Sequence, residues 1–200
     1  MAKPGWLHTS KNSGSGNDTV GVSTLAPHSG RTARNGNLTF RASGVTDRIV
    51  AVTQNGRPEY VTIESAKAAG QAGGNITISG KTNSSKLTFS MGTGDLVITL
   101  PSQYTAHSMA TNNGENISGD PGAAQEIDYS ITIPIPVNGG TGEKTKQIIV
   151  TANGGQTGVC LITQAATEAT LTVTPTSLTL DWEGAEQTLT VASNTTWEII

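Results

Sequence analysis

In QIIVTANGGQTGVCLITQ, at residues 147–164, two runs of alternating apolar and polar residues flank a glycine-containing turn. Alternation with a period of two is typical of β-strands with one buried face, so the stretch predicts a β-hairpin. Residues 37–54, NLTFRASGVTDRIVAVTQ, align with it without a gap and end on the same Thr-Gln pair. The chain therefore holds two copies of one hairpin.

A second, looser repeat lies outside these hairpins. Residues 171–197 have their counterpart in residues 60–86, where a first strand also leads into a second strand and a run rich in Thr, Asn and Ser. The order along the chain is a closing half, a complete unit and an opening half. A β-sandwich cannot bury its core with half its strands, so the halves must meet, either within one molecule or between neighbours.

The composition indicates an all-β protein. The chain has 200 residues, 24 of them glycine, and only 4% are aromatic. Short runs of Val, Ile and Thr between Gly and Asn clusters are typical of short strands joined by tight turns. We predict two sandwiches: a complete one at residues 58–166, and one assembled from residues 1–57 and 167–200 by circular permutation or by strand exchange.

The charge and the first residues exclude several classes of function. A formal net charge of -3 gives no electrostatic reason to expect binding to nucleic acid, and it argues equally against a polybasic membrane anchor. The opening MAKPGWLHTSKNSGSG has no apolar segment of the secretory kind. If these residues are the full gene product, we expect synthesis in the cytoplasm without general export. The three histidines lack metal-ligand spacing, so we expect no metal and no cofactor.

Joined end to beginning, the chain is similar to a known family. Its motifs occur in order: Pro175 with Ser177, Ser193-Asn194-Thr195-Thr196-Trp197, Trp6 before the turn at 13–16, Gly30 with Arg34, and Val52-Thr53-Gln54. On these residues the composite resembles a single BACON domain, the Bacteroidetes-associated immunoglobulin-like β-sandwich. The central unit resembles a divergent copy without Trp. The resemblance implies two immunoglobulin-like sandwiches.

The family's settings suggest two functions. BACON domains are modules of secreted Bacteroidetes proteins, associated with binding glycans or mucin, and they occur in virion proteins of phages that infect those bacteria. Without a signal sequence we expect the phage setting. The chain would be a non-enzymatic auxiliary or decoration protein of the capsid in the virion, with the shell and copies of itself as partners and a weak glycan contact. The alternative is a carbohydrate- or mucin-binding module of a secreted protein.

Two groups of residues are candidate sites. The assembly seam, where the halves would meet, consists of Trp6, Trp197, Ile199 and Ile200. The interaction loop lies at residues 102–127, which have no clear period, and a loop of that length in a compact domain is usually functional or disordered. Its candidate contacts are Tyr104, His107, Asn112, Asn113 and Tyr129.

The tyrosines of the loop are candidate sugar platforms, although Tyr129 alternates with Ile127 and Ile131 and shares their spacing. Glu126 and Asp128 point to the same side of a strand, and we interpret them as a solvated strand face instead of a glycosidase pair. No nucleophile with a patterned base is present. The sequence therefore predicts no enzyme.

Overall fold

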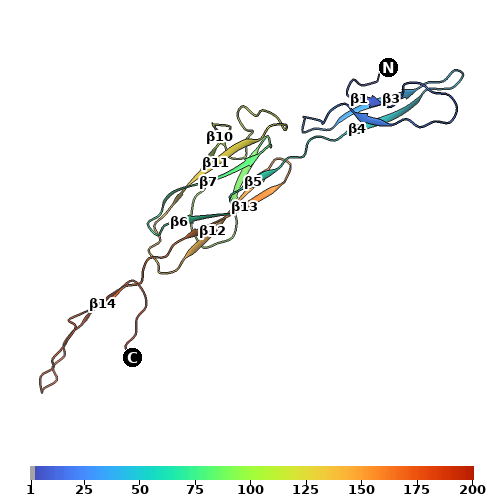
Figure 1. Cartoon of the computed structure of the whole chain (residues 1–200). Helices are drawn as coiled ribbons and strands as arrows, with labels where there is room; N and C mark the ends of the chain where they lie inside the picture. The colour runs from blue at the N-terminus through green and yellow to red at the C-terminus, as the bar shows by residue number, and fades with distance from the viewer. Residues whose placement is uncertain (1–2) are drawn as a thin grey trace.

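The computed structural model describes residues 3–200, and every regular element in that range is a β-strand. Three parts follow one another along an elongated molecule (Figure 1): β1–β4 at one end, β5–β13 in the middle, and β14–β15 at the other end. No helix in the described range could cross a membrane.

The N-terminal part consists of two separate two-stranded sheets. Its strands are β1 (Leu7–Thr9), β2 (Val22–Thr24), β3 (Arg34–Phe40) and β4 (Arg48–Gln54). β1 pairs with β2, and β3 pairs with β4, both antiparallel. Neither edge of the β3–β4 hairpin carries a third strand. The sheet edges of this part are therefore open.

The central part is built from two larger sheets. The five-stranded sheet runs in the order β10 (Met109–Asn112), β9 (Gln103–Ala106), β11 (Ile127–Ile135), β7 (Gly74–Thr82) and β5 (Val61–Ile63). The four-stranded sheet runs in the order β6 (Ala66–Ala69), β13 (Thr157–Gln164), β12 (Lys144–Ala152) and β8 (Leu87–Met91). Only the β6–β13 pair in it is parallel.

One hydrophobic core joins the two central sheets. Alternate residues of each strand point inward, so that β11 buries every second side chain from Ile127 to Ile135. The ring of Phe89 on β8 lies 5.1 Å from that of Tyr104 and 5.8 Å from that of Tyr129, which belong to the opposite sheet. The sheets therefore pack face to face, and the central part has a complete core of its own.

The C-terminal part has one hairpin, β14 (Leu171–Thr174) with β15 (Thr190–Ser193). The alternating runs at 177–182 and 196–200 predict two further strands, and this prediction is wrong for the isolated chain. Trp182 and Ile200 on these runs are exposed. An alternating segment becomes a strand only beside a partner that takes its hydrogen bonds, and here it has none.

The interaction loop is also shorter than predicted. Residues 103–112 form the β9–β10 hairpin, which turns at His107 and Ser108 with φ of 49° and 62°. Two positive φ values fit the two-residue turn that matches strand twist. The sequence signal was missed because that turn normally carries Asn or Gly. Residues 113–126 contain no strand.

Candidate functional site

The N-terminal and central hairpins share one register. Leu38 lies opposite Val50 in the β3–β4 pair, and Ile148 lies opposite Cys160 in the β12–β13 pair. Each number in the second pair exceeds its counterpart by 110, as in the gapless sequence alignment. The two hairpins therefore pair in the same way.

The likeness extends to hydrogen bonds outside the strand pairing, from side chains and from the backbone. Three hydrogen bonds of the N-terminal part recur in the central unit 110 residues later. The bond of Gln54 to the Ala26 carbonyl matches that of Gln164 to the Pro136 carbonyl, and the bond of His28 to the Thr32 carbonyl matches that of Asn138 to the Gly142 carbonyl. The bond from the Arg57 N–H to the Gly30 carbonyl matches the one from the Thr167 N–H to the Gly140 carbonyl. The N-terminal part is thus built like the closing half of the central unit.

The C-terminal hairpin is built like the opening half. Asn83 accepts from the Tyr60 N–H at 2.8 Å and donates to the Pro58 carbonyl at 3.0 Å. Asn194 accepts from the Thr170 N–H at 2.8 Å and donates to the Glu168 carbonyl at 2.8 Å. In both parts the asparagine side chain therefore binds the residues that stand just before the first strand, which is β5 in the central unit and β14 in the C-terminal part.

The strand register places Leu171 opposite Ser193 where the central unit has Val61 opposite Thr82. Residue 171 therefore corresponds to residue 61 of the central unit, one position later than residue 60, which the sequence repeat predicts.

The halves differ from the central unit in burial. Phe40 is 46% exposed and Val50 is 48% exposed, whereas their counterparts Val150 and Cys160 are fully buried. On the other side, Leu189 is 48% exposed where the central unit buries Ile78 completely. Both halves therefore expose part of the face that the complete unit uses as its core, although Leu38, the counterpart of Ile148, is itself buried at 6% exposure.

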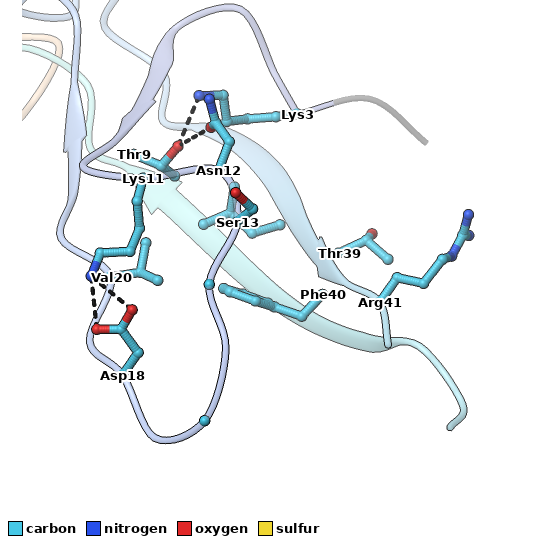
Figure 2. Close-up of a pocket in the computed structure, with 13 residues that line it drawn as sticks. Lys3, Thr9, Lys11, Asn12, Ser13, Asp18, Val20, Thr39, Phe40 and Arg41 are labelled. Atoms are coloured by element: carbon cyan, nitrogen blue, oxygen red, sulfur yellow. Dashed lines mark hydrogen bonds and ion pairs between the residues drawn. The ribbon is translucent and has the colours of Figure 1, made fainter. Parts of the chain in front are cut away.

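A groove of about 540 Å³ opens on this face of the N-terminal part (Figure 2). Leu38 and Phe40 contribute its apolar lining, and Lys3, Lys11 and Arg41 contribute its cations. Lys11 is paired with Asp18 at 2.7 Å. The groove thus combines the exposed Phe40 and the buried Leu38 with three cations, two of which are paired with aspartates.

The predicted assembly seam is divided between the two ends of the chain. Trp6 is half-buried, with the Arg34 guanidinium 4.7 Å from its ring centre. Trp197, Ile199 and Ile200 are exposed in the C-terminal part. Within one molecule the structure does not bring these residues together (Figure 1).

The tyrosines of the interaction loop face the core. Tyr104 and Tyr129 are each 3% exposed, so their rings offer no platform to a sugar, which corrects that expectation. Burial raises the pKa of Tyr104 to about 12. The Tyr129 hydroxyl donates to the Thr62 carbonyl at 2.6 Å. Alternation with Ile127 and Ile131 was the signal that places Tyr129 inside.

The polar residues of the loop separate into two groups. His107 and Asn112 lie exposed on the β9–β10 hairpin. Asn113 instead accepts from the Phe89 N–H at 2.7 Å and donates to the Phe89 carbonyl at 3.0 Å, closing the edge of β8. Of the predicted loop set, His107 and Asn112 are therefore exposed, Asn113 is partly exposed and engaged with β8, and the two tyrosines are buried.

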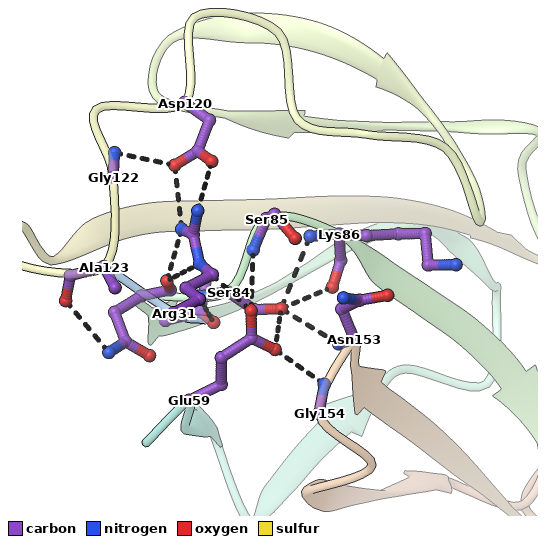
Figure 3. Close-up of polar contacts among 12 residues, drawn as sticks. Arg31, Glu59, Ser84, Ser85, Lys86, Asp120, Gly122, Ala123, Asn153 and Gly154 are labelled. Atoms are coloured by element: carbon purple, nitrogen blue, oxygen red, sulfur yellow. Dashed lines mark hydrogen bonds and ion pairs between the residues drawn. The ribbon is translucent and has the colours of Figure 1, made fainter. Parts of the chain in front are cut away.

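A cluster that the sequence did not predict joins the N-terminal part to the central unit (Figure 3). Arg31 lies 3.0 Å from a Glu59 carboxylate oxygen and 2.6 Å from one of Asp120. It also donates to the Asn83 carbonyl at 2.6 Å. Glu59 is nearly buried and accepts from the Gly154 N–H at 2.6 Å. Arg31 thus ties three separate segments together.

Asp120 is the part of the long loop that contacts the N-terminal part. Burial alone would raise its pKa, but bonds from Arg31 and from the Gly122 N–H outweigh burial and hold the pKa below its usual value. Asp120 also closes a turn at Asp120-Pro121-Gly122 by accepting from the Gly122 N–H at 3.0 Å. Its partner Arg31 is 89 residues away, so no local pattern connects them.

The paired acids near β11 form ion pairs on the surface. Lys81 contacts Glu126 at 2.5 Å and Asp128 at 3.4 Å, and all three side chains are largely solvated. Across residues 3–200 no group of His, Cys, Asp and Glu is arranged to hold a metal ion.

A family model matches residues 1–55: BACON, described as "Putative binding domain, N-terminal". Among curated proteins, no match is found. Solved structures similar to the chain include two endo-fucoidan hydrolases of glycoside hydrolase family 107. MfFcnA9 is 16% identical with a TM-score of 0.31, over 83% of this chain and 27% of that chain. MfFcnA4 is 14% identical with a TM-score of 0.28, over 84% and 23%. The chain spans about a quarter of their length.

Proposed function

We propose that the chain is a non-catalytic structural protein made of BACON-type, immunoglobulin-like sandwich units, and that its binding surfaces are the two half-units at its ends. The observation that carries the proposal is the exposure of Phe40, Val50 and Leu189 where the central unit buries the matching side chains. Apolar faces of this kind mark interaction sites in folded proteins. The proposed work of the chain is therefore assembly.

Its proposed setting is the virion of a phage that infects Bacteroidetes, as an auxiliary or decoration protein that reinforces the capsid. The sequence resemblance to BACON domains supports this setting, and so does the elongated arrangement of the sheets, which suits a protein lying on or projecting from a shell. The proposed partners are shell proteins and copies of the chain itself.

Quantitative mass spectrometry of purified virions tests the setting. A structural component should be present at a fixed ratio to the major capsid protein and should stay bound through gradient purification. A chain that is found only in the lysate, and never in the particles, contradicts the capsid role. Treatment of intact particles with protease serves as a control, since a decoration protein on the surface is cleaved before the shell.

A second candidate function is carbohydrate binding, because the matched family is described as a binding domain. With Tyr104 and Tyr129 in the core, Trp182 is the most exposed large aromatic residue in the described range, at 92%. Exposed Trp rings stack on sugars. A glycan array that includes mucin O-glycans tests this function: sugar-specific binding that is lost in Trp182→Ala favours the module over the structural role.

A further inference from the structure

We propose that residues 168–200 of one copy complete residues 3–57 of a second copy, so that the chain assembles head to tail by strand exchange. The inference rests on the proposed function in one respect, namely that the two halves are parts of one sandwich unit. It adds the identity of the partner, which is another molecule of the same chain.

The central unit shows how the halves fit. There, β8 begins at Leu87, four residues after Asn83, and pairs along the free edge of β12 with Phe89 opposite Val150. In the halves, β3 has a free edge at Phe40, the counterpart of Val150. Counted from Asn194 in the same way, the corresponding strand would begin at residue 198, so residues 198–200 match the start of β8. The matching position for this exposed segment is therefore the β3 edge of a neighbour.

The other edge of the hairpin has a matching strand as well. In the central unit β6 pairs in parallel with β13, with Ala68 opposite Thr163. The offset of 110 residues makes Leu178 the counterpart of Ala68 and Thr53 the counterpart of Thr163. It therefore places Leu178 beside Thr53 on the free edge of β4. The run at 177–182 has the alternation of a strand but remains irregular in the isolated chain. Strand addition to a free edge supplies the hydrogen bonds that it lacks.

The two halves are also complementary in charge. Residues 1–57 contain seven Lys and Arg and two Asp, whereas residues 168–200 contain five Asp and Glu and no Lys or Arg. The net charges are thus +5 and −5, while the whole chain carries only −3. Opposite charge on two surfaces steers their encounter and disfavours contact between like ends. The complementarity favours binding of the C-terminal part of one copy to the N-terminal part of another.

The junctions favour contact between copies over closure within one. Thr167 is bonded to the central unit at Gly140, and the next residue, Glu168, is already bonded to Asn194. At the other end Arg57 and Pro58 show the same arrangement. No free linker separates the parts, and the halves lie at opposite ends of the sandwich (Figure 1). Closure within one chain would require the C-terminal part to reach the far end of the central unit from the Thr167–Glu168 junction, which has no free residues to span that distance.

The geometry of such an assembly follows from the repeat. The contact joins different surfaces of the two molecules, so it is heterologous and generates a ring or an open array. Arg57-Pro58 and Thr167-Glu168 make equivalent bonds on either side of the central unit. Each added copy therefore continues the chain of sandwiches in the same direction.

Sedimentation velocity over a wide concentration range is the first test. The full chain should form a growing series of oligomers, and the series should shorten at high salt because opposite charges contribute. A strictly monomeric chain at every concentration overturns the inference.

Two variants identify the contacting ends. Phe40→Asp blocks the acceptor face and leaves the C-terminal part intact, whereas Leu189→Asp blocks the donor face and leaves the N-terminal part intact. Each variant alone should stay monomeric, and an equal mixture of both should stop at the dimer. Large oligomers in either variant, or no dimer in the mixture, contradict head-to-tail exchange. Val159→Asp, on an exposed face of the central unit, is the control and should assemble like the parent.

A cysteine reporter then detects the completed core directly. Val50→Cys places a thiol at the position that corresponds to buried Cys160. The new thiol should react rapidly with a thiol reagent in dilute protein and become protected as oligomers form, while Cys160 stays protected throughout. Reactivity at Val50→Cys that is independent of concentration overturns the inference.

These outcomes are distinct from those of virion analysis. Head-to-tail assembly of a chain that is absent from virions supports the strand exchange and contradicts the capsid setting. A chain that is monomeric but present in virions supports the capsid setting and contradicts the strand exchange.

Discussion

The β12–β13 and β3–β4 hairpins have the same pairing but different surroundings. β8 and β6 cover both edges of the first, and the opposite sheet covers its face, so Ile148 and Cys160 are fully buried. The second has two free edges and an uncovered Phe40. Short-range bonds are therefore enough to set the register of a half-unit. Without further strands, part of its apolar face stays exposed.

The largest expected effect separates the two regions by stability. Ile78→Ala removes a fully buried side chain from the central core and should lower the free energy of unfolding by about 2–5 kcal/mol. Its counterpart Leu189→Ala removes a half-exposed side chain and should change the stability of the isolated chain by roughly 0.5 kcal/mol or less. Urea unfolding of dilute protein measures both. Equal losses would mean that the C-terminal part already has a core.

The next effect concerns the cluster that joins the two regions. Arg31→Ala leaves Asp120 and the buried Glu59 without their cation, and should weaken the attachment of the N-terminal part by about 2 kcal/mol. Hydrogen exchange of the β4 amides should speed up accordingly. Arg41→Ala breaks an exposed pair with Asp47 and should cost little, about 0–1 kcal/mol. If both variants exchange at the parent's rate, the cluster does not hold the junction.

A third comparison uses the two matched asparagines. Asn83→Ala removes a buried amide that serves Tyr60, Pro58 and Ala123, and should cost about 1–3 kcal/mol because those groups lose their partner. Asn194 is exposed, so in Asn194→Ala water can replace its hydrogen bonds to Thr170 and Glu168. The expected cost in the monomer is therefore under about 1 kcal/mol. Differential scanning calorimetry distinguishes the two. After assembly the cost of Asn194→Ala should rise toward that of Asn83→Ala.

The smallest effect is a dependence on pH at the junction. The pKa of Asp120 is lowered in the folded chain, so its contribution is present above the pKa of the unfolded state and is lost as pH falls through the folded value. Attachment of the N-terminal part should therefore be steady near neutrality and weaken below about pH 4. Asp120→Asn should weaken attachment at neutral pH and flatten the acid limb. Limited proteolysis across this range, with Asp47→Asn as control, provides the measurement.

The sequence predicted the hairpins well because their alternation and glycine turns are local. The repeat of 37–54 in 147–164 also predicted which residues correspond, down to the pair of Gln54 and Gln164. The strand prediction was wrong at residues 177–182, which alternate like a strand but have no neighbouring strand to pair with in the isolated chain.

The site was less predictable than the fold. Arg31 and Asp120 are far apart in sequence and have no motif in common. Tyr104 was assigned to a loop because residues 102–127 lack a period over their whole length, although the short β9 within them alternates. The opposite charges of the two ends were hidden in a near-neutral total. They become visible only when each half is counted alone.

The parallel pairing of β6 with β13 has a mechanical consequence. The chain enters the central unit through β5 and β6 and leaves it through β13, so tension applied to the two ends slides β6 and β13 past each other. The evenly spaced bonds of a parallel pair then share the force, instead of opening one at a time as in a peeled hairpin. Because Arg57-Pro58 and Thr167-Glu168 are hydrogen-bonded on both sides, no flexible linker extends before force reaches the central unit. We therefore expect the central unit to resist stretching along the chain.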